Sequence, residues 1–294
     1  MFIIKYKKIF VAISAILVSL SIASILVFGL NFGIDFKGGS LLEVEYTNIR
    51  PEQKVIEDII KPLSIGEIRV QPMGENGYSI KTRDITEGER GSIMQALGGE
   101  VIEKSFTSIG PSVGAELVRK SIISFILVVL GIIFWIAYSF RKVSKPVSSW
   151  KYGFIAIASL IHDVTISAGV FAFLGFLTGV EVDTLFVVAI LTILGLSVSD
   201  TIVVFDRIRE NIRIGHFKTF EETVGRSINQ VYTRSIATSS TVIIALLALV
   251  FFGPTSTKMF AIMLTAGMFF GTYSSIFLAS PLLVITNNLQ KKTK

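Results

Sequence analysis

The stretch Thr184 to Phe205, TLFVVAILTILGLSVSDTIVVF, is apolar over the length of a membrane-spanning helix but contains one carboxylate, Asp200. A helix needs about 20 predominantly apolar residues to cross a bilayer. A charged side chain at the centre of such a helix costs roughly 2.5–3.5 kcal/mol on insertion scales, so an acid there usually has a partner or a task. The stretch therefore predicts a transmembrane helix and points to transport or energy coupling.

The rest of the chain has the composition of a membrane protein. Of its 294 residues 51% are hydrophobic, and the mean hydropathy of +0.67 lies outside the range of soluble globular proteins. Six apolar runs reach spanning length: 9–30, 121–140, 152–177, 184–205, 235–252 and 258–286. Three lysines precede the first run, as in a signal peptide. Its apolar core is too long for one and no A-x-A cleavage site follows, so a retained helix is expected.

Lysine and arginine are distributed unevenly over the short segments between these runs. With the N-terminus in the cytoplasm, 16 basic residues fall in the inside segments 1–8, 141–151, 206–234 and 287–294. The two short outside loops hold one basic residue, Lys258. The positive-inside rule then predicts a multi-pass membrane protein with both termini in the cytoplasm. The net charge of +6 belongs to the cytoplasmic rim, so no nucleic-acid partner is expected.

The long segment 31–120 has the periodicity of a separate domain. It holds 14 acidic and 11 basic residues, and long segments cross the membrane largely regardless of charge. Strands and helices are expected, in the order βαββαβ, at 41–47, 51–63, 65–73, 77–83, 86–97 and 99–110. That order is the split βαβ arrangement of ferredoxin-like domains. The segment contains no histidine and no cysteine, so a binding or lever-like role is expected in place of catalysis.

The expected fold class is a polytopic α-helical membrane protein with six transmembrane helices and one extracytoplasmic ferredoxin-like α+β domain. The predicted boundaries follow from the apolar runs and the charge distribution. They are a cytoplasmic N-terminus at 1–8, a first transmembrane helix at 9–30, the extracytoplasmic domain at 31–120, transmembrane helices two to six within 121–286, and a cytoplasmic C-terminus at 287–294.

Hydroxyl side chains accompany Asp200 along its helix. Ser197 lies three residues before it and Thr201 one residue after it, so both place hydroxyls near the carboxyl group. One interpretation is a structural hydrogen bond between neighbouring helices. The other, which we favour, is a group that gains and loses a proton during transport.

Arg234 stands at the head of the apolar run 235–252 and is the basic residue nearest to another span. Cytoplasmic ends of spans collect arginine, so an ordinary positive-inside anchor is one interpretation. The other is a partner for Asp200, because Thr238 and neighbouring hydroxyls form a polar face on the helix that follows. A guanidinium beside hydroxyls suits a water-filled path through a bundle. The residues alone leave both interpretations open.

His162 and Asp163 lie within the run 152–177 and are candidates to support such a polar path. Adjacent helical residues point about 100° apart, so these two side chains are not expected to pair directly. Asp163 is expected to extend the path or to meet Arg234. The only other histidine, His216, falls in a segment expected in the cytoplasm, so neither a metal site nor a cofactor is expected.

Five motifs in fixed order give the chain a family resemblance. They are GIDFKGG (33–39), SIGPSVGAEL (108–117), GLSVSDTIVVFDRIREN (195–211), TRSIATS (233–239) and GTYSSIFLASPLL (271–283). Each motif alone is weak evidence. Together, in the frame of six helices and one domain, they resemble the SecD/SecF family over essentially the whole chain. That family is itself similar to the resistance-nodulation-division exporters.

The resemblance implies a function. It implies a non-enzymatic accessory subunit of the Sec protein translocase, which uses the proton motive force to promote late steps of polypeptide export across the plasma membrane. The implied partners are a SecD-like subunit, a SecYEG-type channel, the exported polypeptide and the lipid bilayer. It also implies that Arg234 acts in proton transport together with Asp200, with an acid from the partner subunit completing the site.

Two other classes of function remain as alternatives. The first is a stand-alone proton-driven exporter of lipids or small molecules related to the resistance-nodulation-division superfamily. Six helices form only half of such an exporter, and one small domain offers no large substrate cavity. The second is an intramembrane aspartyl protease with Asp163 and Asp200 as its dyad. That chemistry needs two carboxyl groups close enough to share a proton.

Overall fold

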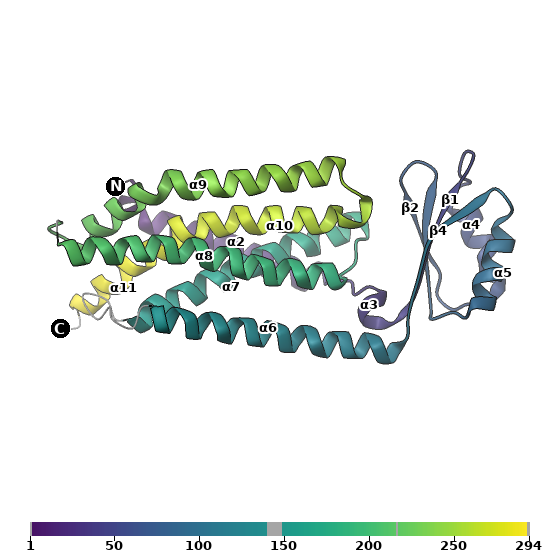
Figure 1. Cartoon of the computed structure of the whole chain (residues 1–294), viewed down its shortest axis with the longest axis horizontal. Helices are drawn as coiled ribbons and strands as arrows, with labels where there is room; N and C mark the ends of the chain where they lie inside the picture. The colour runs from purple at the N-terminus through teal and green to yellow at the C-terminus, as the bar shows by residue number, and fades with distance from the viewer. Residues whose placement is uncertain (1, 140–148, 216, 293–294) are drawn as a thin grey trace. The chain divides into compact units, whose positions relative to one another are not determined.

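A computed structural model describes residues 2–139, 149–215 and 217–292 of the chain (Figure 1). The chain divides into two compact units. The sheet domain comprises residues 32–123 together with 181–184, and the other described residues form the helical bundle. Six helices in the described residues are long and apolar enough to cross a membrane. This architecture confirms the expected class, a mostly helical membrane protein with one small α+β domain.

Long helices make up most of the bundle, together with one four-residue helix and one π-helical turn. They are α1 (Phe2–Lys5), α2 (Lys7–Phe28), α6 (Pro111–Ser139), α7 (Ser149–Thr178), α8 (Thr184–Ile214), α9 (Phe220–Phe252), α10 (Thr255–Ser274), the π-helical turn η2 (Ser275–Ala279) and α11 (Ser280–Lys292). Several helices extend past the apolar run that predicted them. α6 begins ten residues before the apolar run at 121, and α9 begins at Phe220 although its apolar run begins at 235.

Small residues allow the bundle helices to pack closely. A Cβ atom added at Gly169 on α7 would lie 2.5 Å from the Cβ atom of Ser21 on α2. One added at Gly267 on α10 would lie 2.3 Å from a side-chain carbon of Ile193 on α8. Both distances are below any real contact, so glycine is required where these helices cross. This is the small-residue packing typical of helices in membranes.

The sheet domain has the predicted order of elements. After the short helix α3 (Ile34–Lys37), its elements are β1 (Gly39–Tyr46), α4 (Gln53–Ile60), the 3₁₀ turn η1 (Lys61–Leu63), β2 (Arg69–Met73), β3 (Gly77–Thr82), α5 (Glu87–Leu97) and β4 (Val101–Ile109). All neighbouring strands are antiparallel, and the spatial order is β2-β3-β1-β4. This is the ferredoxin-like topology that the βαββαβ pattern predicts. β2 is shorter than expected because Ser64 and Gly66, both at positive φ, turn the chain before it.

One hydrophobic core holds the domain together. Ile56 and Ile60 of α4 and Ile93 of α5 are fully buried, as are Val44 and Ile80 on the central strands. These residues recur at helical spacing in the helices and at alternate positions in the strands, so each element presents one apolar face. Figure 1 shows α4 and α5 on the same side of the sheet.

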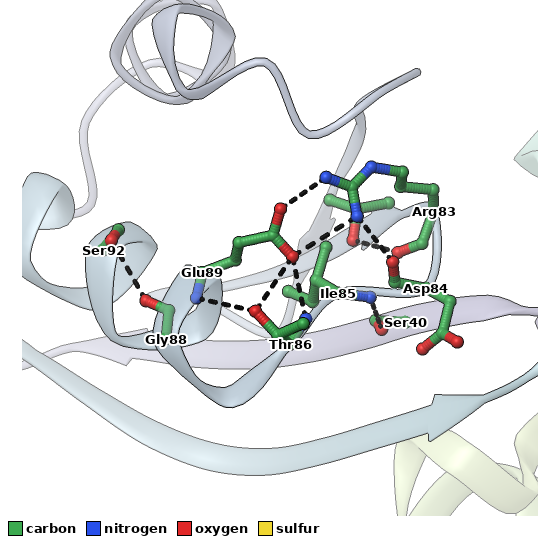
Figure 2. Close-up of polar contacts among 9 residues, drawn as sticks. Ser40, Arg83, Asp84, Ile85, Thr86, Gly88, Glu89 and Ser92 are labelled. Atoms are coloured by element: carbon green, nitrogen blue, oxygen red, sulfur yellow. Dashed lines mark hydrogen bonds and ion pairs between the residues drawn. The ribbon is translucent and has the colours of Figure 1, made fainter.

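A capping box begins α5, as the sequence predicts. The side chain of Thr86 accepts a hydrogen bond from the backbone N–H of Glu89, and the Glu89 carboxylate accepts one from the backbone N–H of Thr86 at 2.8 Å (Figure 2). The guanidinium of Arg83 also donates to Glu89. These donors, Arg83 first and the Thr86 backbone second, lower the pKa of Glu89 to about 2.

Candidate functional site

Buried polar side chains gather within the bundle on α7, α8, α9 and α10. Each is at most 6% exposed, and they are His162, Asp163, Ser167, Ser197, Thr201, Ser235, Ser239, Thr272 and Ser274. Burying polar groups is costly unless they form hydrogen bonds, and in a membrane the unbonded alternative is worse. These buried polar residues are therefore the candidate site of the bundle.

Asp163 of α7 is fully buried and surrounded by donors. Its Oδ2 atom accepts hydrogen bonds from the Ser274 hydroxyl of α10 at 2.7 Å and from the Ser197 hydroxyl of α8. Its Oδ1 atom lies 2.8 Å from Nδ1 of His162. The expected partner Arg234 makes no bond to it. One carboxyl group thus joins three helices.

The expectation that His162 and Asp163 do not pair directly was wrong. The two side chains leave the helix in directions about 100° apart, but their ends can still meet at the helix surface. Both side chains are buried, at 3% and 0% exposure, so neither can hydrogen-bond to bulk water. They hydrogen-bond to each other across the surface of their own helix instead. The imidazole also stacks against the ring of Tyr273, with ring centroids 6.2 Å apart.

Asp200 of α8 is the second carboxyl group, and it is only partly buried. Its Oδ2 atom accepts a hydrogen bond of 3.1 Å from the hydroxyl of Thr272 on α10. The Thr272 hydroxyl lies 2.5 Å from that of Ser239 on α9. A hydroxyl has one proton to donate, so when Thr272 donates to Asp200, Ser239 donates to Thr272. The three groups form a short chain of hydrogen bonds across three helices.

Two helices connect the carboxyl groups. α8 carries both Asp200 and Ser197, which bonds Asp163, and α10 carries Thr272 and Ser274, which bond one carboxyl group each. A shift of either helix therefore alters the hydrogen bonds of both acids. No hydrogen bond joins the two carboxyl groups to each other in the part of the chain that the structure describes, so the arrangement lacks the shared proton of an aspartyl protease dyad.

The remaining predicted residues lie in different surroundings. Arg234 and Thr238 of α9 are exposed, and Arg234 makes no hydrogen bond or ion pair with any residue that the structure describes. Thr201 is buried, and its hydroxyl has no partner among those residues. The same holds for the hydroxyl of Ser235, the neighbour of Arg234. Joint action of Asp200 and Arg234 stays a prediction.

Sequence reasoning missed two partners of the acids, Thr272 and Ser274. A signal was present, because GTYS (271–274) interrupts the apolar run 258–286 with hydroxyls. Nothing in the sequence says that this segment faces α7 and α8. Gly271 allows the approach, since a Cβ atom added there would lie 3.3 Å from Cβ of Ser197.

No group of three or more histidine, cysteine, aspartate or glutamate side chains that could hold a metal ion occurs in the described ranges. His216 lies outside the described residues. The described cluster combines two carboxyl groups, which can each bind or release a proton, with hydroxyls that hydrogen-bond to them.

Known proteins resemble the chain over most of its length. The family description "Protein export membrane protein SecD/SecF, C-terminal" matches residues 90–289, and "SecD/SecF GG Motif" matches residues 23–48. The protein translocase subunit SecF of Thermobaculum terrenum is 42% identical, over 97% of this chain and 94% of its own. That of Anaerolinea thermophila is 37% identical, over 95% of this chain and 92% of its own.

A solved structure has the same fold. The crystal structure of SecDF, a translocon-associated membrane protein from Thermus thermophilus, matches 97% of this chain with a TM-score of 0.85 and 28% identity. A second SecDF structure, in a super-membrane-facing form, matches 98% of this chain with a TM-score of 0.70. This chain spans 38% and 39% of the length of those two chains. By sequence and by fold, the chain belongs to the SecD/SecF family of protein export membrane proteins.

Proposed function

We propose that this chain is a non-catalytic accessory subunit of a Sec-type protein translocase that couples proton movement to polypeptide export. The observation that carries the proposal is the pair of carboxyl groups, Asp163 and Asp200, each of which accepts a hydrogen bond from a hydroxyl of α10 inside a membrane bundle. Intramembrane acids of this kind mark proton relays. The relatives are named protein translocase subunit SecF, and from these names we take polypeptide export as the process that the protons drive.

The proton site comprises Asp200 and Arg234, with an acid from a SecD-like partner. Asp200 is only partly buried and Arg234 is exposed within this chain, so a partner subunit has access to both. Asp163, His162, Ser197, Thr201 and Thr238 support the polar path. Gain or loss of a proton at Asp200 changes its bond to Thr272 and thereby the packing of α8 against α10.

The available energy is sufficient for such a cycle. One elementary charge crossing 100 mV supplies about 2.3 kcal/mol. At about 1.4 kcal/mol per factor of ten, this shifts a two-state equilibrium roughly fiftyfold. In a bundle with two packings of similar free energy, protonation of one carboxyl group is therefore enough to change which packing is populated.

The proposal also includes the membrane, the orientation and the partners of the chain. It places the bundle in the plasma (inner) membrane with both termini in the cytoplasm, so that the sheet domain lies outside and meets the emerging polypeptide. A SecYEG-type channel is the further partner. The translocase names of the relatives argue against the stand-alone exporter.

Protein export into membrane vesicles, with and without an imposed proton gradient, tests the proposal. Asp200→Asn keeps the size and hydrogen bonding of the side chain but removes titration, so the gradient should no longer stimulate export. Asp206→Asn is the matched control, because Asp206 is an exposed acid on the same helix that pairs with Arg209. If Asp200→Asn responds to the gradient as strongly as the parent, the assignment of the proton site is wrong.

A further inference from the structure

The segment 181–184, between α7 and α8, belongs to the sheet domain. Although α7 and α8 are bundle helices, residues 181–184 group with residues 32–123 in one compact unit. Two carboxylates hold this segment there: Glu181, from the segment itself, and Asp35, from the GIDFKGG motif. We call Glu181, Asp35 and the groups they bond the loop clamp.

Glu181 bonds two cations of the sheet. Its Oε1 atom lies 3.1 Å from Nη1 of Arg69 on β2, and its Oε2 atom lies 2.9 Å from Nζ of Lys81 on β3. Arg69 and Lys81 are direct partners in the β2–β3 register, so the two cations stand side by side. The Glu181 side chain is only 11% exposed, which reduces the screening of these ion pairs by water.

A cavity of about 230 Å³ beside this ion pair explains why a carboxylate sits there. Its charged lining residues are four bases and two acids: Lys37, Arg69, Lys81, Arg83, Glu67 and Glu181. Glu67 is 87% exposed and lies 3.6 Å from Arg69, so it adds little. Arg83 pairs with Glu89. Glu181 is therefore the largely buried acid that bonds the cavity's other sheet cations, Arg69 and Lys81.

Asp35 forms the second half of the loop clamp. Its Oδ2 atom accepts hydrogen bonds from both the backbone N–H and the hydroxyl of Thr184, at 2.7 and 2.6 Å. Thr184 is the first residue of α8, so Asp35 satisfies a free N–H group at the start of that helix and complements its dipole. The neighbouring backbone adds a bond of 2.9 Å from the N–H of Gly33 to the carbonyl of Val182.

The bonded segment leads directly into the helix of the proton site. α8 runs without a break from Thr184 to Ile214 and carries Ser197 and Asp200. Sixteen residues separate Thr184 from Asp200, about 24 Å along a helix that rises 1.5 Å per residue. A continuous helix moves as one body, so a shift of α8 at Asp200 reaches the loop clamp.

We propose that Glu181 and Asp35 are positioning residues for energy coupling: they fasten the sheet domain to the start of α8, so that repacking around Asp200 moves the sheet domain. This inference rests on the proposed function. The proposal requires that the bonds made by Glu181 and Asp35 remain intact throughout the proton cycle.

Neutral variants test the loop clamp in the same vesicle assay. Glu181→Gln leaves two cations without their carboxylate, and Asp35→Asn leaves a weaker acceptor at the start of α8. Each should reduce the stimulation of export by the gradient about three- to tenfold, which corresponds to about 0.7–1.4 kcal/mol at about 1.4 kcal/mol per factor of ten. Export without the gradient should stay unchanged. Glu67→Gln is the matched control, because Glu67 lines the same cavity without holding the loop.

A charge exchange separates positioning from general stability. Lys81→Glu alone places two acids together and should uncouple export. Lys81→Glu combined with Glu181→Lys restores opposite charges and should recover most of the stimulation. A cysteine at position 182 reports on the loop directly, because Val182 is 2% exposed and the chain has no cysteine of its own. Its labelling should become faster in Glu181→Gln and Asp35→Asn.

Asp200→Asn in the same vesicles separates the two proposals. If it keeps the full response to the gradient, the proposed function fails, whatever the loop variants do. If Asp200→Asn loses the response while Glu181→Gln and Asp35→Asn keep it, only the loop clamp is refuted. Unchanged labelling at position 182 in both variants would refute the loop clamp as well, because the two carboxylates would then not hold the loop.

Discussion

At the scale of single residues, the acids could be found from the sequence but their partners could not. Asp200 is conspicuous because a carboxylate interrupts an apolar stretch. Thr272 follows it by 72 positions, and only the packing of α10 against α8 brings the two together. The error over His162 and Asp163 has a related cause, since the sequence did not show that both side chains are fully enclosed.

Thr272 offers a prediction at this scale, because its hydroxyl is the donor to Asp200. Thr272→Val keeps the shape but removes the donor, so it should weaken the stimulation of export by the gradient about three- to tenfold, as expected for the loss of roughly 1 kcal/mol. Thr272→Ser keeps the hydroxyl and should behave nearly as the parent. The vesicle export assay measures both variants.

A control for this variant lies two turns earlier on the same helix. The hydroxyl of Thr265 bonds only the carbonyl of Ala261, within its own helix. Thr265→Val should therefore leave the stimulation unchanged. If Thr265→Val and Thr272→Val reduced the stimulation of export equally, α10 would be sensitive to any such substitution. A specific role for the Thr272 hydroxyl would then be refuted.

At the scale of elements, hydrophobic periodicity predicted whether each segment is a helix or a strand, and in which order they follow. It predicted less well where each element begins and ends. The order of the sheet domain follows from alternation in its strands and from helical spacing in its helices. The helices extend past the apolar runs because an apolar run reports the thickness of the membrane, whereas backbone hydrogen bonding continues into polar sequence. α8 accordingly continues to Ile214, nine residues past its apolar run.

The N-terminus of α5 provides a prediction about pH. Because the pKa of Glu89 falls from its usual 4.5 to about 2 in the folded chain, its ionised form stabilises the fold. That contribution is complete above about pH 4.5 and is lost as the pH falls toward 2. Amide hydrogen exchange of α5, measured on the full chain and corrected for the intrinsic pH dependence, should show loss of protection in this window.

Two variants test whether Glu89 is the group that causes this loss of protection at low pH. Glu89→Gln should be less protected at neutral pH and should show little further change between pH 4.5 and 2. Glu87→Gln, on the same turn but paired only with Arg90, is the control and should keep the response. If Glu89→Gln and the parent lose protection in parallel on acidification, another group controls the acid stability of α5.

At the scale of the whole molecule, much of the apolar surface is not covered by the chain itself. None of the most apolar 18-residue window of α6 is buried within the described chain, and only 11% of that window in α2 is buried. Lipid and partner subunits are the surroundings that such surfaces require. These surfaces leave room for the SecD-like partner that the proposed proton site includes.

The orientation of the molecule is the last prediction, and the proton cycle depends on it. The distribution of basic residues places both termini in the cytoplasm, which puts the β2–β3 turn at residues 74–76 outside. The native chain is cysteine-free, so single cysteines at Glu75 and at the exposed Asn229 of α9 can be labelled without background. An impermeant reagent added outside intact cells should label position 75 and leave position 229 unmodified until the cells are opened. The reverse pattern would place the sheet domain in the cytoplasm, where it could not meet a polypeptide leaving the channel. The coupling mechanism would then fail even if Asp200 binds and releases protons.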